Sequence, residues 1–390
     1  MSSARYSDLV WHQFKKYTLA YRSLQMLVAL LLLAVFAPLL ASDKPLLWRV
    51  SNGPWESPWF WSLFDRNVYE GTLDIVFNVM LVLGVPSFFL FFVGAVREPP
   101  VRTLRVLLVL FGILLLFTLF HHPSHAKISY PDLEKIMIAE GQEVTSVYPL
   151  LPFGFQSVDL SNVRSPISWA HPLGTDNAGR DVCTRMIYGT RISMTVGLFS
   201  VALYMVIGTI LGALAGYYGG RVDALILRLI EVMLSIPSLF LILAMAAFVE
   251  KRSIFHVMLI IAAVLWTTPA RLVRGEFMRL RSMEFVVAAV ASGFGKRHIM
   301  FREMLPNALG PVLVTATFGV ASSILIESTV SFLGLGDITV PSWGQILNTG
   351  RSTGMWTLIL APGIAIFITV SLLNLVGEGL RDAMDPKLRQ

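Results

Sequence analysis

The residues that could do chemistry are few, and their spacing matches no catalytic motif. The string SGFGKRH, at residues 292–298, resembles a phosphate-binding loop, whose pattern is G-x-x-x-x-G-K-[ST]. Val290 stands where the first glycine of that pattern belongs, and Arg297 stands where a hydroxyl would bind Mg²⁺. The sequence contains no HExxH, and no GxSxG lies near a plausible His and Asp. We therefore expect that the chain is not an enzyme and does not hydrolyse ATP itself.

Residues that bind metals are also scattered. The chain has a single cysteine, Cys183, so an intrachain disulfide is impossible. Its seven histidines do not combine with that cysteine in a zinc-ligand pattern. We expect no metal site.

Carboxylates inside apolar segments are the other candidates for chemistry, because a charge in lipid is costly and is usually functional. Glu327 is the best placed, with Ser322, Ser323 and Ser328 near it. A stand-alone carrier or channel driven by an ion gradient would use such a carboxylate, whereas structural pairing is the simpler interpretation. Arg228 and Glu231 are spaced i,i+3 near the start of another apolar segment, so they could pair with each other.

The composition predicts that most of the chain lies in a membrane. Hydrophobic residues make up 55% of the 390 residues and charged residues only 14%, against about 25% in soluble proteins. The net charge of +6 does not indicate a nucleic-acid partner. Lys and Arg gather in short segments between apolar runs, which is the pattern that sets orientation in a membrane.

Eight segments are long and apolar enough to cross the bilayer as helices, since a span needs about 20 residues. Helices are expected because lipid satisfies no backbone polar groups, and the alternation of a barrel strand is absent. The basic segments place both termini in the cytoplasm. The predicted fold is an all-α transmembrane helix bundle with spans at about 24–41, 74–96, 104–120, 191–216, 226–249, 255–275, 308–332 and 356–377.

The spans divide the chain into parts. We expect a cytoplasmic segment (1–23), a region with three spans (24–120), an extracytoplasmic segment (121–190), a core module with five spans (191–377) and a cytoplasmic tail (378–390). A second outward segment, at 42–73, contains NGPWESPWFWSLF. We interpret its tryptophans as an interfacial belt. A contact with a substrate or a partner is the alternative.

One predicted span carries glycines at every fourth position. Residues four apart share a helix face, so the glycines form a smooth groove for close packing of another helix. The ladder consists of Gly208, Gly212, Gly216 and Gly220.

A short apolar piece interrupts the spans, in the string EFVVAAVASGFGKRHIMFREMLPN at 284–307. Residues 284–294 are enough for about three helical turns and too few to cross a bilayer. Such a helix could fit a groove on another protein, or it could lie against lipid. The residues alone do not separate these two interpretations.

This piece resembles the cytoplasmic coupling loop, called the EAA loop, of permease subunits in binding-protein-dependent ABC importers. Val287 stands where the family has a glutamate, and Glu303 stands where a histidine is usual. The resemblance assigns contact with an ATPase to the 276–307 loop, through Glu284, Val287, Ala288, Ala289, Gly293, Pro306 and Asn307.

The resemblance covers about 171–386. The strings HPLGTDNAGRDVCTRMIYGTRIS, GYYGGRVDALILRLIEVMLSIPSL, SFLGLGDITVPSWGQIL and GEGLRDAMDPKLR follow in the order of the C-type permease of the oligopeptide, dipeptide and nickel importers. Members of this family usually have six spans. The spans at 74–96 and 104–120 are therefore extra, and they either pack outside the bundle or contact another subunit.

The resemblance implies a transport subunit of the bacterial cytoplasmic membrane that forms half of a pathway, with peptides as the leading substrate. The implied partners are a second permease, ATPase subunits that bind the ATP and Mg²⁺, an extracytoplasmic solute-binding protein and membrane lipid. The chain itself would hold no cofactor. A membrane-embedded enzyme has no motif to support it.

Overall fold

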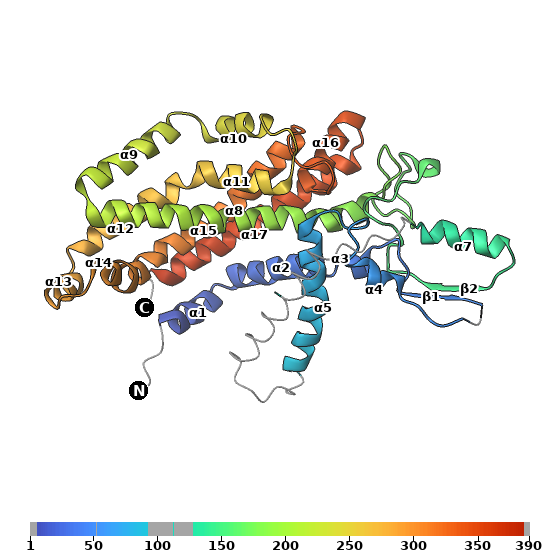
Figure 1. Cartoon of the computed structure of the whole chain (residues 1–390), viewed down its shortest axis with the longest axis horizontal. Helices are drawn as coiled ribbons and strands as arrows, with labels where there is room; N and C mark the ends of the chain where they lie inside the picture. The colour runs from blue at the N-terminus through green and yellow to red at the C-terminus, as the bar shows by residue number, and fades with distance from the viewer. Residues whose placement is uncertain (1–5, 52, 93–111, 113–127, 386–390) are drawn as a thin grey trace. The chain divides into compact units, whose positions relative to one another are not determined.

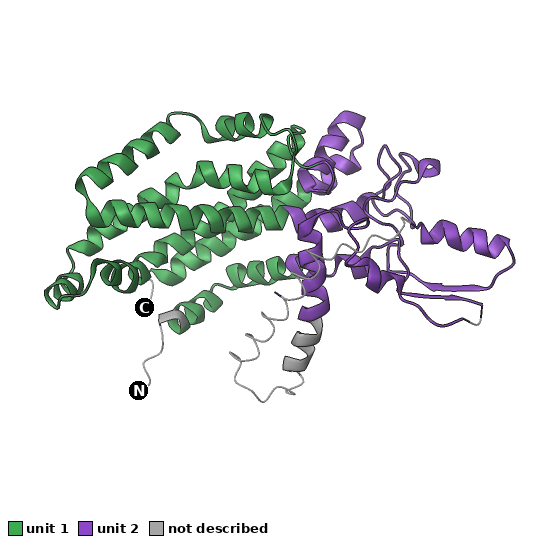
Figure 2. Cartoon of the chain, viewed as in Figure 1, with its two compact units in different colours: residues 1–29, 193–337, 363–390 green, residues 30–192, 338–362 purple. Residues whose placement is uncertain are grey.

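The computed structural model describes residues 6–51, 53–92, 112 and 128–385. The chain forms two compact units that interleave in sequence (Figure 2). Unit 1 contains residues 1–29, 193–337 and 363–390, and unit 2 contains residues 30–192 and 338–362.

Unit 1 is a bundle of helices (Figure 1). Three long helices, α2, α8 and α17, contribute residues to both units. The helices with residues in unit 1 are α1 (Tyr6–Lys16), α2 (Thr18–Val35), α8 (Val182–Tyr218), α9 (Gly220–Leu234), α10 (Ser238–Ala247), α11 (Ile254–Leu265), α12 (Thr267–Arg281), α13 (Glu284–Ala291), α14 (Lys296–His298), a π-helix (Ile299–Met304), α15 (Leu305–Phe332) and α17 (Thr357–Met384).

Four helical stretches of the described residues are long and apolar enough to cross a membrane. They are Thr18–Val35, Val182–Tyr218, Lys296–Phe332 and Thr357–Met384. Two bent pairs, α9 with α10 and α11 with α12, raise the number to as many as six. These correspond to six of the eight predicted spans. Of the extra two, the first coincides with α5 (Thr72–Phe92), and 104–120 falls outside the described residues.

Prolines mark the two bends. Ser235 to Pro237 separate α9 from α10, and the helix axes meet at 78° there. A proline has no amide hydrogen and restricts the residue before it, so α9 ends ahead of Pro237. Pro269 lies in the first turn of α12, just after the 41° bend at Trp266. The prolines therefore explain why two apolar segments are broken and not straight.

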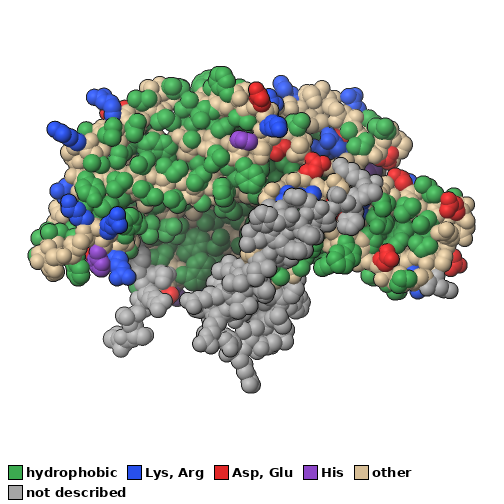
Figure 3. All heavy atoms as spheres, viewed as in Figure 1, with side chains coloured by type: hydrophobic (Ala, Val, Ile, Leu, Met, Phe, Trp, Pro, Cys, Tyr) green, Lys and Arg blue, Asp and Glu red, His purple; other side chains and the backbone are tan. Residues whose placement is uncertain are grey.

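The visible surface of unit 1 is largely apolar, as Figure 3 shows. Lys and Arg lie at the end that carries α13 and α14, and others lie at the opposite end together with Asp and Glu. Large exposed side chains on its helices include Leu225, Phe240 and Phe367. An apolar band with charged residues at its two ends is typical of a membrane-embedded bundle.

Unit 2 joins the two segments that the sequence placed outside the spans. Its elements are α3 (Ala37–Leu40), β1 (Leu47–Val50), α4 (Pro58–Ser62), α5, α7 (Tyr130–Ala139), β2 (Val144–Val147), a 3₁₀ turn (Leu160–Asn162) and α16 (Trp343–Thr353). Strand β1 pairs antiparallel with β2, with Leu47 opposite Val147 and Val50 opposite Val144. The hydrophobic core of unit 2 includes Tyr69, Ile75, Val79, Phe155 and Tyr188.

A buried arginine ties three helices together in unit 2. The Arg191 side chain, on α8, is fully buried. Its Nη1 donates to Asp74 Oδ1 at 3.2 Å, and its Nη2 donates to Asn78 Oδ1 at 3.0 Å, both on α5. Its Nε donates to the Ala34 carbonyl at 2.7 Å, near the C-terminus of α2. Since a buried charge needs a counter-charge and hydrogen bonds, α5 is an integral part of this unit.

Replacing Asp74 should test this arrangement. In the Asp74→Ala variant, Arg191 stays buried without its carboxylate, so the free energy of unfolding should fall by about 3 kcal/mol. A denaturant titration of the detergent-solubilised protein measures this change. The control is Asp132→Ala, whose exposed side chain pairs with the exposed Lys135 and Ser129 and should cost less than about 0.5 kcal/mol. Equal midpoints for the two variants would contradict the structural role of Asp74.

Candidate functional site

The loop between α12 and α15 folds as three short helical pieces. Helix α13 covers most of the predicted 284–294 helix. It ends because Gly293 adopts a left-handed conformation with φ of 77°, which L side chains rarely take. The Phe294 amide then donates to the Ala289 carbonyl at 3.2 Å, which closes the helix end. The loop is therefore a folded element with a defined direction.

Helix α13 has an inner face and an outer face. Val286 and Ala289 are buried at 2% and 7% exposure, and α13 packs against α12 and the π-helix. Val287 and Val290 are 56% and 57% exposed. Apolar side chains of α13 are thus exposed beside its packed face.

The predicted contact residues fall on both faces. Val286 and Ala289 anchor the helix, so of the predicted set Ala289 faces inward. The exposed members are Glu284, Val287, Ala288, Gly293, Pro306 and Asn307. Glu284 lies in the first turn of α13, where its negative charge interacts favourably with the positive end of the helix dipole.

The part of the loop that follows α13 is held by side-chain contacts. Asn307 Nδ2 donates to the Glu303 carbonyl at 2.6 Å, one turn back in the chain. Pro306 lies in the first turn of α15 and has no amide hydrogen, and the π-helix directly precedes it. Lys296 Nζ lies 5.6 Å from the centre of the Tyr218 ring, so the loop also contacts the end of α8.

The glycine ladder supports the helix that leads into this loop. A Cβ on Gly208 would lie 2.6 Å from the Trp266 carbonyl oxygen, and a Cβ on Gly216 would lie 2.6 Å from that of Arg274. Between them, Gly212 faces the Ala270 carbonyl in the same way. Backbone atoms of α8 and α12 are therefore in direct contact over three turns.

Gly220 does not take part in this packing. It opens α9 with φ of 52°, and among the described residues nothing lies within 4 Å of a Cβ built there. The ladder in the structure is thus Gly208, Gly212 and Gly216, and Gly220 serves the turn from α8 into α9.

An ion pair reinforces the same region. Arg274, on α12, donates from Nη2 to Asp223 Oδ2 at 2.7 Å and from Nε to Asp223 Oδ1. Asp223 lies in the first turn of α9. A two-point contact between a guanidinium and a carboxylate fixes orientation as well as distance. Helix α12 is therefore held on two sides just before it reaches α13.

Glu327 lies in unit 1 and is fully buried. Its Oε1 accepts a hydrogen bond from Ser331 Oγ at 2.7 Å, and its Oε2 accepts one from Ser193 Oγ at 3.4 Å on α8. Of the serines predicted near it, Ser323 and Ser328 are buried, whereas Ser322 is exposed. The geometry is that of a polar contact between α15 and α8. Among the described residues, no group of three His, Cys, Asp or Glu side chains could hold a metal ion.

The HPLGTDNAGRD string forms a capping structure in unit 2. His171 Nδ1 and Asp181 Oδ2 lie 2.9 Å apart, and both side chains are buried. Asp181 Oδ1 accepts from the Thr184 amide at 2.6 Å, in the first turn of α8. Gly179, with φ of 73°, lies against the Asp159 backbone with no room for a Cβ. These residues fix the start of α8.

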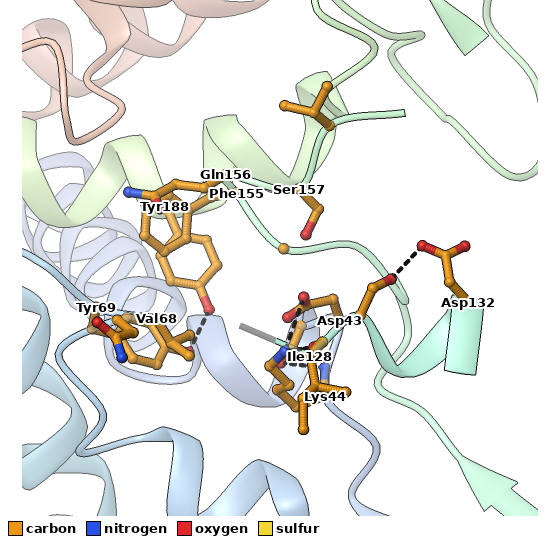
Figure 4. A pocket seen from close by; sticks show the side chains of 15 residues that line it. Asp43, Lys44, Val68, Tyr69, Ile128, Asp132, Phe155, Gln156, Ser157 and Tyr188 are labelled. Atoms are coloured by element: carbon orange, nitrogen blue, oxygen red, sulfur yellow. Dashed lines mark hydrogen bonds and ion pairs between the residues drawn. The ribbon is translucent and has the colours of Figure 1, made fainter. Parts of the chain in front are cut away.

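Unit 2 also contains a pocket of about 260 Å³, which sequence reasoning missed (Figure 4). Tyr69 and Tyr188 line it, and their hydroxyls lie 3.1 Å apart. Burial raises the pKa of Tyr69, so its phenol stays neutral. Lys44 also lines it and pairs with Asp43 at 3.3 Å. These residues come from distant parts of the chain, so no local pattern could indicate the pocket.

Comparison with known proteins matches most of the chain. Residues 208–390 match the family described as binding-protein-dependent transport system inner membrane component. Residues 6–52 match the N-terminal TM domain of oligopeptide transport permease C.

Individual relatives agree with these matches. The dipeptide transport system permease protein DppC of Alkalihalophilus pseudofirmus is 42% identical over 233 residues, which are 59% of this chain and 76% of that protein. The oligopeptide transport system permease protein OppC of Haemophilus influenzae is 38% identical over 244 residues, 61% of this chain and 78% of that protein. Among solved structures, an inward-facing MetNI methionine ABC transporter has a TM-score of 0.43 and 20% identity, covering 51% of this chain and 96% of that one.

Alanine substitutions should test the α8–α12 contact. Gly212→Ala places a methyl group against the Ala270 carbonyl, so the free energy of unfolding should fall by about 1–3 kcal/mol. The control is Gly275→Ala on α12, where the described residues leave open space around the new methyl group. That change should stabilise the helix by up to about 1 kcal/mol. Thermal denaturation in detergent compares the two variants, and a Gly212→Ala protein as stable as wild type would contradict the contact.

Proposed function

The chain belongs to the binding-protein-dependent transport system inner membrane component family, and we propose that it imports peptides as one of two permease halves driven by separate ATPase subunits. The transport role follows from the family. The proposed coupling to ATPase subunits rests on the exposed apolar face of α13, because this face provides a surface that an ATPase could bind.

The composition of α13 favours a protein groove over a lipid surface. A helix that lies on a membrane usually carries Lys and Arg on its polar face. Residues 284–291, EFVVAAVA, contain no basic residue, and the one charged residue is the acidic Glu284. Small alanines beside Val287 and Val290 let a groove approach the helix closely. We propose that an ATPase subunit supplies this groove, and that Val287 replaces a polar contact of other family members with an apolar one.

The connections of α13 explain how movement would reach the bundle. On one side, α13 follows α12, which is held to α8 by backbone contact. On the other side, the helical stretch Lys296–Phe332 continues from the loop into the bundle. A push on α13 would therefore move packed helices as rigid bodies, which is how alternating access commonly works. ATP and Mg²⁺ would bind to the ATPase subunits, whose cycle would bias two states of the bundle.

The remaining partners and the orientation belong to the same proposal. We place both termini and the 276–307 loop in the cytoplasm, since Lys and Arg gather there. Unit 2 segments 42–73 and 121–190 would then face a solute-binding protein outside the membrane. A second, related permease would complete the pathway. The names of the relatives, dipeptide and oligopeptide permeases, support peptides as the substrate.

A single charge on the outer face of α13 should test the coupling proposal. In the Val290→Asp variant, an unpaired carboxylate would enter an apolar groove, which costs several kcal/mol and should weaken ATPase binding at least about tenfold. Affinity purification through a tag on this chain, followed by quantitative mass spectrometry, measures how much ATPase is retained. Uptake of a radiolabelled dipeptide by cells should fall in parallel.

The matched control is Val163→Asp, which adds the same charge at an exposed valine in unit 2. It should leave the amount of ATPase and the membrane level of the chain unchanged. If Val290→Asp retains its ATPase subunits and its uptake, α13 is not the site of coupling.

A further inference from the structure

The α9–α10 pair carries an exposed ion pair. Arg228 Nη1 donates to Glu231 Oε2 at 2.9 Å, and the two side chains are 80% and 51% exposed. Ile226 and Ile230, on the other face of α9, are buried. The two charges therefore point away from the rest of unit 1. Leu225 and Val232 are exposed beside them.

The position of this pair along α9 is unusual for charges. Asp223, in the first turn of α9, pairs with the basic side chain of Arg274. Arg228 and Glu231 lie about 8 and 12 Å further along the helix axis, at a rise of about 1.5 Å per residue. They are thus inside the segment that must cross the bilayer if α9 and α10 form one span. Charges at such positions usually face the bundle interior or water, because lipid cannot solvate them.

The backbone of the same face gives an independent observation. Ser235, Ile236 and Pro237, between the two helices, are exposed. The regular series of amide-to-carbonyl bonds is interrupted there, since Pro237 has no amide hydrogen. Non-helical backbone at membrane depth is tolerated only where protein covers it or where it lines water. The ion pair and the break therefore both make contact with lipid unfavourable at this face.

We propose that this face of α9, with the break that follows it, lines a water-filled solute pathway in which Arg228 and Glu231 exchange partners with the charged ends of a zwitterionic solute. The inference rests on the proposed function, because a peptide with free ends carries one ammonium and one carboxylate group. A guanidinium binds a carboxylate at two points, and a carboxylate accepts from an ammonium group. When the solute leaves, the two side chains pair again, so neither charge is left unpaired.

Thiol labelling tests whether this face meets water. Cys183 is the only cysteine of the chain, so Cys183→Ser gives a background free of thiols. Ser235→Cys in that background places a thiol in the break, next to Glu231. The control, Val206→Cys on α8, places a thiol at another exposed position of unit 1, where the native side chain is apolar. In the importer complex purified through a tag on this chain, Ser235→Cys should react with water-soluble methanethiosulfonates at least about tenfold faster than the control.

The charge of the reagent tests the role of the ion pair. One unpaired charge about 8 Å from the thiol changes the local concentration of a singly charged reagent about 2.4-fold at the dielectric constant of water, in opposite directions for a cation and an anion. Arg228→Ala should therefore raise the ratio of cationic to anionic labelling of Ser235→Cys about fivefold, and Glu231→Ala should lower it by a similar factor. The double variant should restore the original ratio.

A second ion pair provides the matched control. Asp132 and Lys135 form the same i,i+3 pair on α7, which is too short to cross a membrane. Replacing either by alanine should leave the labelling ratio unchanged. If Ser235→Cys reacts no faster than Val206→Cys, or if the ratio does not respond to Arg228 and Glu231, the inference is wrong and another subunit or lipid covers this face. The amount of ATPase subunits in the same purified complex tests the proposed function separately, because it does not depend on the labelling of α9.

Discussion

Direct backbone contact between α8 and α12 is the constraint on which the rest of unit 1 depends. Within a membrane, helices gain little from the hydrophobic effect, so close van der Waals packing has to hold them together. Gly208, Gly212 and Gly216 permit this approach because any Cβ would meet a carbonyl oxygen of α12. Once α12 is fixed against α8, the direction in which α13 leaves the bundle is fixed as well. The loop is thus a folded extension of the bundle, in which α13 packs against α12 and the π-helix.

Buried polar groups supply the second kind of constraint, and each one joins different helices. Arg191 brings α2, α5 and α8 together in unit 2. Glu327 joins α15 to α8 in unit 1 through serine hydroxyls. Such groups add specificity because a wrong pairing of helices would leave a charge or an acceptor unsatisfied. Both side chains are thereby engaged in structural contacts, and for Glu327 this corresponds to the simpler of the two interpretations that the sequence allowed.

The sequence could predict what depends on local spacing. Long apolar runs predicted the spans of unit 1, the i,i+4 glycines predicted the packed face of α8, and Gly293 predicted the end of α13. What depends on distant residues could not be predicted. Strands β1 and β2 are almost a hundred residues apart, and no local pattern indicates that they pair. Gly220 continued the spacing of the ladder, but its positive φ places it in a turn, which spacing alone does not reveal.

The two broken spans differ in how firmly their angles are held. At the bend between α11 and α12, Trp266 and Pro269 lie against Gly208, so a change of angle would disrupt backbone packing. At the bend between α9 and α10, Ser235 to Pro237 are exposed, so the break itself is not packed against other described residues. A region with few buried contacts opens at a lower free-energy cost. The first bend therefore links α12 to α8, whereas beyond the second bend α10 is held by its own packing against α11 and α15.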